Sequence, residues 1–104
     1  MRVEAAYAEG RLTLSLSGEL DHHAAREIMR EIEEQLELRL PGDCVLDLAG
    51  LTFMDSSGIA VLLKTYRRVC AFGGRLRAEH VRAQPLRVLR AAGIGRLIDV
   101  TAQS

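Results

Sequence analysis

The sequence has no Trp and few other aromatic residues, since Tyr and Phe together make up 4% of its 104 residues. Sites that stack sugars or nucleic-acid bases depend on aromatic side chains, so no such site is expected. No apolar run approaches the ~20 residues of a membrane span. Residues 1–4, Met-Arg-Val-Glu, lack the apolar stretch of a signal peptide. We therefore expect a cytoplasmic protein without a membrane partner.

Cysteine and histidine are also scarce, and their spacing does not suggest a metal site. Cys44 and Cys70 are far apart and lie outside any Cys-x-x-Cys motif. We expect both to be small core residues rather than a disulfide or a metal pair. His22 and His23 are adjacent, so on a helix they point about 100° apart, whereas paired helical ligands need a spacing of three or four residues. No metal or other cofactor is expected.

The net charge is zero, with 14 basic and 14 acidic residues, which argues against a general nucleic-acid binder. The two halves nevertheless differ. Residues 1–55 hold 5 Arg against 12 acidic residues, a net charge of −7, and residues 56–104 hold 9 basic against 2 acidic residues, +7. If the fold interleaves the halves, many of these charges pair on the surface. A protein partner is favoured over DNA. Four basic residues would fit a patch or a solvated surface: Arg67, Arg68, Arg75 and Arg77.

Hydrophobic periodicity in the first part of the chain predicts a β-hairpin followed by a helix. Residues 3–7 and 11–17 alternate around a Glu-Gly turn and read as two antiparallel strands with one buried face. After Gly18-Glu19-Leu20-Asp21 the apolar residues recur with helical spacing. Asp21 is the expected N-cap, and Pro41-Gly42 is expected to end the helix.

The rest of the chain alternates strands and helices. The expected elements are a buried strand over 44–48, a helix from about Gly58 to Gly73-Gly74, a strand over 75–79, a short helix over 85–92 and a final apolar segment over 97–100. The order is β-β-α-β-α-β-α-β. This predicts an α/β fold in which residues 1–104 form a single domain, with helices packed on a mixed central sheet of about four to five strands.

Residues 52–58, Thr-Phe-Met-Asp-Ser-Ser-Gly, place two hydroxyls behind an acid where a strand gives way to a helix. Asp55, Ser56 and Ser57 therefore occupy the helix start, where Ser and Asp oxygens accept the unpaired first-turn N–H groups. We expect one of the two serines to serve as this cap. The other hydroxyl is then exposed on a rigid corner where a kinase can reach it.

A serine hydrolase is the alternative of a different class. It needs a nucleophile, a base and an oxyanion hole, but the two serines lie in Met-Asp-Ser-Ser-Gly rather than in a Gly-x-Ser-x-Gly elbow. His80 is the available base for such a serine, yet a lone His at the end of a strand is more often a surface residue. The chain also lacks both common glycine-rich phosphate-binding motifs. We therefore expect that the protein is not an enzyme.

Three segments together resemble a known family: Gly18-Glu19-Leu20-Asp21-His22-His23, residues 51–58 and Gly73-Gly74. The chain is similar to the anti-sigma factor antagonists of the STAS domain class, with a particular likeness to its sporulation antagonists. The likeness extends from the first hairpin to residues 91–98. Asp-Ser-Ser-Gly alone is a weak motif, and its separation from Gly-Glu-Leu-Asp-His-His makes the combination specific.

The resemblance implies partner switching. In its unphosphorylated form such a protein binds an anti-sigma factor that is also an ATP-dependent serine kinase, and so releases the sigma factor. Phosphorylation of Ser56 by that kinase ends the binding, and a PP2C-type phosphatase restores it. ATP belongs to the kinase, so the chain needs no cofactor of its own. Some STAS domains act instead as non-switching interaction modules of signalling assemblies, which is the second interpretation.

The resemblance also suggests which residues contact the partner. It places residues 18–23, and with them Asp21 and His23, near the partner surface, although Asp21 is equally explained as a helix cap. Asp55 is positioned to orient the acceptor serine, and Ser57 continues into the helix beside it. Gly58 is expected to allow close approach of the kinase backbone.

Overall fold

The structure is a computed structural model, and it describes residues 1–103. Five strands form one sheet in the order β1-β2-β3-β4-β5. They are β1 (Arg2–Ala8), β2 (Arg11–Leu20), β3 (Asp43–Met54), β4 (Arg75–Val81) and β5 (Asp99–Ala102). β1 pairs antiparallel with β2, and each later pair of neighbours is parallel. The predicted α/β fold with a mixed sheet, and its order of elements, are confirmed.

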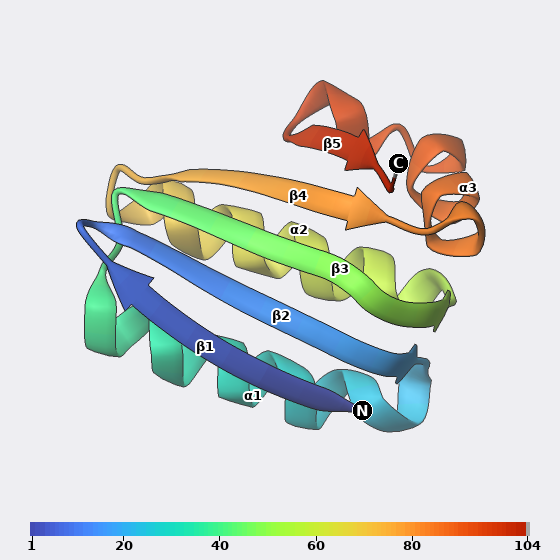
Figure 1. Ribbon diagram of the computed structural model, residues 1–104, viewed down its shortest axis with the longest axis horizontal. Coiled ribbons are helices and arrows are strands. Elements are labelled where there is room, and N and C mark those ends of the chain that lie inside the picture. Colours follow the sequence, from blue (N-terminus) through green and yellow to red (C-terminus); the bar gives the residue numbers. More distant parts are fainter. Residues whose placement is uncertain (104) are drawn as a thin grey trace.

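The helices are α1 (His22–Arg39), α2 (Ser56–Ala71) and α3 (Ala83–Ala91), followed by the short 3-10 helix η1 (Ile94–Arg96). α1 and α2 lie side by side under one face of the sheet and run in the same direction, because each connects two parallel strands (Figure 1). α3 lies beyond the end of β4, next to the last part of β3. No helix among the described residues is long and apolar enough to cross a membrane.

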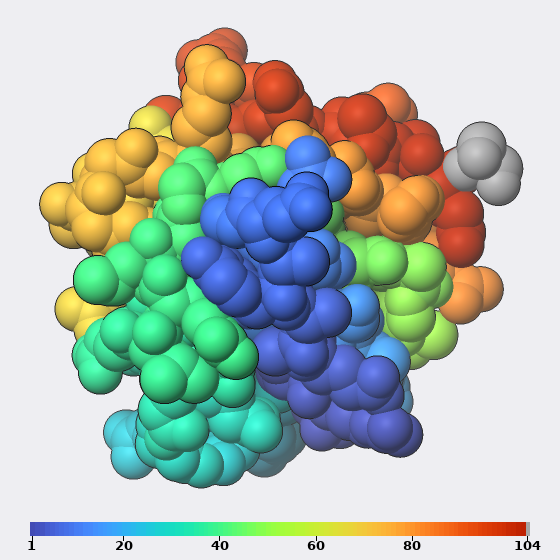
Figure 2. All heavy atoms as spheres, turned by 60° about the vertical axis from the view of Figure 1, so that its left-hand side comes forward, coloured from blue at the N-terminus to red at the C-terminus, as the bar shows by residue number. Residues whose placement is uncertain are grey.

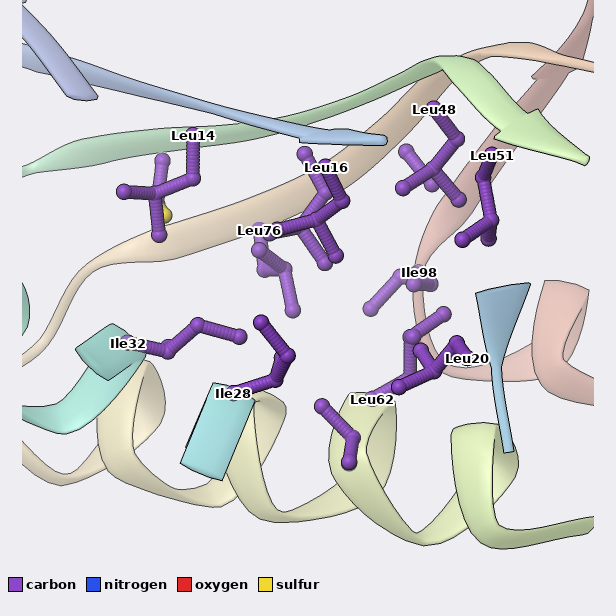
Figure 3. Packing of buried hydrophobic residues seen from close by; sticks show 14 of the residues in the cluster. Leu14, Leu16, Leu20, Ile28, Ile32, Leu48, Leu51, Leu62, Leu76 and Ile98 are labelled. Atoms are coloured by element: carbon purple, nitrogen blue, oxygen red, sulfur yellow. The ribbon is translucent and has the colours of Figure 1, made fainter. Parts of the chain in front are cut away.

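The core fills the space between the sheet and these two helices. Leucines of β2 and β3 point down toward Ile28 and Ile32 of α1 and Leu62 of α2 (Figure 3). The alternation along β2 arises because its even-numbered leucines face this core. β1 is an edge strand that lies against α1 (Figure 2). Thr65 is the buried polar residue of the layer, and its hydroxyl donates to the Val61 carbonyl at 2.8 Å.

Two strands are longer than predicted, and this extension builds the site. β2 continues to Leu20 and β3 to Met54, whereas alternation indicated ends near residues 17 and 48. The two strands pair with each other through the extension, with register shifts between Ser15 and Ser17 and between Gly18 and Glu19. Such bulges reset the side-chain alternation, which is why a periodicity analysis ends the strands early.

The last helix and strand are shifted by one or two residues from their predicted positions. α3 begins at Ala83, so Pro85 lies in its first turn rather than at its first residue. The apolar segment 97–100 is not one strand, because η1 and the following turn precede β5, which begins at Asp99. A Pro in the first helical turn is tolerated because N–H groups there lack intrahelical acceptors.

The two cysteines differ, and both are free thiols. Cys44 lies in the core of β3, and burial raises the pKa of its thiol to about 12. Cys70 is exposed near the end of α2, so its predicted place in the core is wrong. The helix positions that face the core on this turn are Thr65 and Val69.

The oppositely charged halves of the chain do pair on the surface. Arg68 of α2 lies 3.0 Å from Glu33 and 2.9 Å from Glu37, both on α1. Arg77 of β4 lies 3.5 Å from Asp43 of the first half, and 2.8 Å from Glu79 of its own half. Interleaving of the two halves therefore explains these two arginines without a nucleic-acid surface.

Candidate functional site

The site is built where β2 and β3 end side by side. Leu20 of β2 is the register partner of Met54 of β3, and the Asp55 N–H donates to the Leu20 carbonyl at 3.3 Å. A helix follows each of these strands directly. α1 and α2 therefore start next to each other at the carboxyl ends of β2 and β3, which we call the site edge of the sheet (Figure 1). The positive ends of two helix dipoles therefore meet at this edge.

Each helix is capped by an aspartate. The Asp55 carboxylate accepts from the Ser57 N–H at 2.8 Å, and the Asp21 carboxylate accepts from the His23 and Ala24 N–H groups, both at 3.0 Å. The expected cap role of Asp21 is confirmed. The expectation that a serine caps α2 is wrong, because the longer carboxylate side chain of Asp55 takes that role from outside the helix.

The Asp21 cap is sensitive to acid. Its hydrogen bond from the Ala24 N–H, followed by that from the His23 N–H, lowers the pKa of the Asp21 carboxyl. A carboxyl whose pKa is lowered by folding adds stability above its ordinary value of about 3.9, and this contribution is lost as the pH falls below that value. The cap is therefore fully ionised at neutral pH.

The two serines occupy the first two positions of α2. Ser56 is exposed and Ser57 is half-buried. Within residues 1–103 no hydrogen bond engages the hydroxyl of Ser56, and the side-chain cap of α2 is made by Asp55. The structure therefore presents Ser56 to solvent at the corner between β3 and α2. His22 and His23, at the matching start of α1, are also exposed.

Two further residues of this corner were missed by the sequence analysis. Phe53 is 38% exposed although it is an aromatic residue, and it lies two positions before Asp55. Gln84 of α3 accepts from the Met54 N–H at 2.9 Å and donates to the Met54 carbonyl at 3.0 Å. Because aromatic residues are scarce in this chain, Phe53 could have been noticed in the sequence as a candidate site residue. No sequence feature near Gln84 predicts its contact with β3.

Gly58 is buried, and packing against β3 explains why this position is a glycine. A Cβ there would lie 2.4 Å from Met54 Cγ, closer than any real contact. The absent side chain allows the first turn of α2 to press against the end of β3. This is an internal reason, distinct from the predicted approach of a kinase backbone, and contact of Gly58 with a partner stays a prediction.

The arrangement does not assemble a hydrolase site. His80, the suggested base, is exposed, and its Nδ1 lies 3.3 Å from Asp47 Oδ1 on β3. Asp47 precedes the strand end at Met54 by seven residues, and no hydrogen bond within residues 1–103 joins His80 to either serine. The described residues also contain no group of three or more His, Cys, Asp or Glu side chains placed to hold a metal ion.

Comparison with known proteins identifies the family of this chain. The STAS domain family model matches residues 2–104. The anti-sigma F factor antagonist of Paenibacillus polymyxa is 32% identical over 96% of this chain and 86% of its own length. The anti-sigma-B factor antagonist of Bacillus subtilis (strain 168) is 29% identical over 100% of this chain and 94% of its own.

Solved structures give the same result. The anti-sigma factor antagonist SpoIIAA in its unphosphorylated form superposes with a TM-score of 0.80 at 25% identity, over 95% of this chain and 87% of that one. The phosphorylated form of this Bacillus cell fate determinant gives 0.72 at 25% identity, over 95% and 90%. The chain therefore belongs to the STAS domain family. Within that family it is similar to the anti-sigma factor antagonists, regulatory proteins rather than enzymes, and the resemblance seen in the sequence is confirmed.

The capping role of Asp55 predicts different effects for two substitutions. Asp55→Ala removes the acceptor for the Ser57 N–H and should lower the free energy of unfolding by about 1 kcal/mol. Asp55→Asn keeps an acceptor oxygen and should stay within about 0.5 kcal/mol of the wild type. Urea denaturation followed by circular dichroism measures both. Equal losses in the two variants would contradict capping as the role of this side chain.

The contact at Gly58 predicts that even a methyl group is harmful there. Gly58→Ala should lower the free energy of unfolding by about 1–2 kcal/mol, because overpacking against Met54 outweighs the better helix propensity of Ala. The matched control is Gly95→Ala, where a Cβ would meet no atom within 4 Å and the backbone is not left-handed. Urea denaturation of both variants tests this, and a neutral Gly58→Ala would refute it.

Proposed function

We propose that this protein is an anti-anti-sigma factor that is switched by phosphorylation of Ser56. Unphosphorylated, it binds an anti-sigma factor that is also a serine kinase, and the sigma factor is released. The names of its relatives support the coarse role, since they are antagonists of anti-sigma F and anti-sigma-B factors. The observation that carries the switch is the exposed Ser56 hydroxyl, left without a structural role by the Asp55 cap.

The chemistry of the switch is a phosphoryl transfer performed by the partner. The Ser56 hydroxyl oxygen attacks the γ-phosphorus of ATP, the bond to ADP breaks, and the hydroxyl proton passes to a base of the kinase. A PP2C-type phosphatase reverses the modification by hydrolysing phosphoserine to serine and inorganic phosphate. This chain supplies the acceptor and its position, so it is not itself an enzyme and needs no cofactor. Such partners place it in the cytoplasm.

Electrostatics suggest that the added phosphate acts on the interface rather than on the fold. Phosphoserine carries about −1.5 to −2 charge and three acceptor oxygens. At Ser56 that charge lies at the positive start of α2 and close to the start of α1, where anions are stabilised. A partner surface that accepted a neutral hydroxyl is then faced with a dianion. Each loss of about 1.4 kcal/mol weakens binding tenfold.

The surface around Ser56 is the proposed contact region. It comprises Asp55 and Ser57 at the start of α2 and Asp21 and His23 at the start of α1. The paired ends of β2 and β3 bring these two helix starts together. Gly58 contributes by seating the first turn of α2 against Met54. Phe53, two residues before Asp55 in the sequence, adds an exposed aromatic side chain of a kind that is enriched at protein interfaces.

A non-switching STAS interaction module is the second candidate. It shares the fold and differs only in whether Ser56 is modified, so phosphorylation decides between them. The serine hydrolase alternative is disfavoured by the separation of His80 from the serines. Labelling with a fluorophosphonate, which reacts with activated serines, tests it directly, and we expect no label.

Substitutions at Ser56 should separate binding from switching. Ser56→Ala should bind the kinase as tightly as the wild type and take up no phosphate. Ser56→Asp should bind at least about tenfold more weakly, because it places a permanent charge at the interface. Incubation with ATP and an anti-sigma kinase from the same genome, followed by intact-mass and peptide mass spectrometry, should find one phosphate on Ser56.

Ser57→Ala is the matched control, since it removes the neighbouring hydroxyl and should leave phosphorylation intact. Kinase binding without modification of Ser56 would assign the chain to the non-switching modules. Phosphate on Ser57 in the wild type would show that the acceptor was chosen wrongly.

Phosphorylation should cause little refolding. The new charge lies at a helix start that favours anions, so hydrogen exchange of the phosphorylated protein should show the amides of α2 protected as well as before. The same measurement on the unphosphorylated protein provides the baseline. A loss of protection throughout the sheet and helices would mean that phosphorylation acts by unfolding the domain.

A further inference from the structure

A groove between α1 and α2 leads away from the serine site. Its volume is about 530 Å³, and its lining begins on α2 at Ser57 and ends at Lys64. α2 advances about 10 Å between these two residues, roughly two helical turns. Met29 of α1 and Val61 of α2 are buried at 6% and 2% exposure and form an apolar floor. The groove is therefore continuous with the corner that carries Ser56.

The rim of this groove is basic. Arg26 of α1 and Lys64 of α2 are both exposed, and within residues 1–103 neither has a carboxylate oxygen within 4.0 Å. Arg30 also lines the groove, but Glu27 and Glu34 bind its guanidinium. Glu33, the acidic residue of the lining, lies 3.0 Å from Arg68. Two cations above an apolar floor are thus left without a carboxylate partner.

We propose that this groove receives an acidic, amphipathic helical segment of the anti-sigma kinase. An apolar floor with a charged rim fits the binding of a helix whose apolar side enters the groove. Acidic side chains on the exposed part of that helix would meet Arg26 and Lys64. This inference rests on the proposed function, because its occupant belongs to the kinase that would modify Ser56, the residue next to the groove-lining Ser57.

An acidic segment also explains the direction of the switch. Ser57, which lines the groove, is the neighbour of the acceptor serine, so phosphate on Ser56 would stand at the mouth of the groove. A dianion there repels carboxylates of the docked segment, whereas the neutral hydroxyl does not. The carboxylates that attach the docked segment to the basic rim of the unmodified protein would therefore also make the complex sensitive to phosphate on Ser56.

Charge reversal in the groove tests the proposal. Arg26→Glu and Lys64→Glu, in the full chain, should each weaken binding to the purified kinase about tenfold and make binding less dependent on salt. In steady-state phosphorylation of Ser56, the KM for this chain should rise by a similar factor while kcat is unchanged, because docking is impaired and the chemistry is not. Lys64→Arg should behave as the wild type.

The matched control is Arg87→Glu, a reversal of an exposed arginine on α3, outside the groove. It should leave binding and KM unchanged. Reversals that bind like the wild type would overturn the groove proposal, and so would an equal loss in Arg87→Glu. If the reversals alter self-association in sedimentation velocity and leave kinase binding intact, the occupant is a second copy and the proposal is wrong.

The outcome also separates the two proposals. A wild-type chain that neither binds the kinase nor accepts phosphate contradicts the proposed function itself. A wild-type chain that binds and is phosphorylated, together with unaffected Arg26→Glu and Lys64→Glu variants, rejects only the groove.

Discussion

The parallel pairing of the last residues of β2 and β3 is the constraint on which the site depends. Opposition of Leu20 and Met54 fixes where both strands end and therefore where both helices begin. Two segments more than thirty residues apart, Gly18 to His23 and Phe53 to Gly58, then meet at one edge of the sheet. A slip of one strand by one residue would turn either Leu20 or Met54 out of the core. Burial of these two side chains therefore fixes the register that positions the site.

Asp55 and Ser56 have different roles where β3 ends and α2 begins. The Asp55 carboxylate caps the helix and Ser56 is left exposed, so under the proposed function helix stability and phosphorylation would depend on different side chains. A switch that used its capping residue as the phosphate acceptor would change the stability of the helix each time it was modified. Under the proposed function, this separation would let the domain gain and lose a charge without changing its helix cap.

Sequence reasoning recovered the order of elements, the sheet type, the Asp21 cap and the strand-to-helix corner, because these leave local signals in periodicity and capping residues. It ended β2 and β3 too early, since bulges interrupt alternation. It assigned the α2 cap to a serine, because Ser and Asp have similar preferences for the N-cap position. Only the structure shows that Asp55 is the residue that accepts from the Ser57 N–H. Gln84 and the packing reason for Gly58 depend on contacts with β3, which no local pattern in the sequence encodes.

The two hydrogen bonds of Gln84 lie on the side of β3 that β4 leaves unpaired. β4 accompanies β3 only as far as the Asp47–Glu79 pair, so the last part of β3 has no neighbouring strand on that side. The Gln84 side chain ends in an amide, which has the same donor and acceptor groups as a peptide bond. It bonds both the N–H and the carbonyl of Met54, as a residue of a neighbouring strand would. A single side chain thus satisfies the N–H and carbonyl of Met54 on a side of β3 that has no neighbouring strand, which leaves fewer backbone groups there for pairing with a foreign strand.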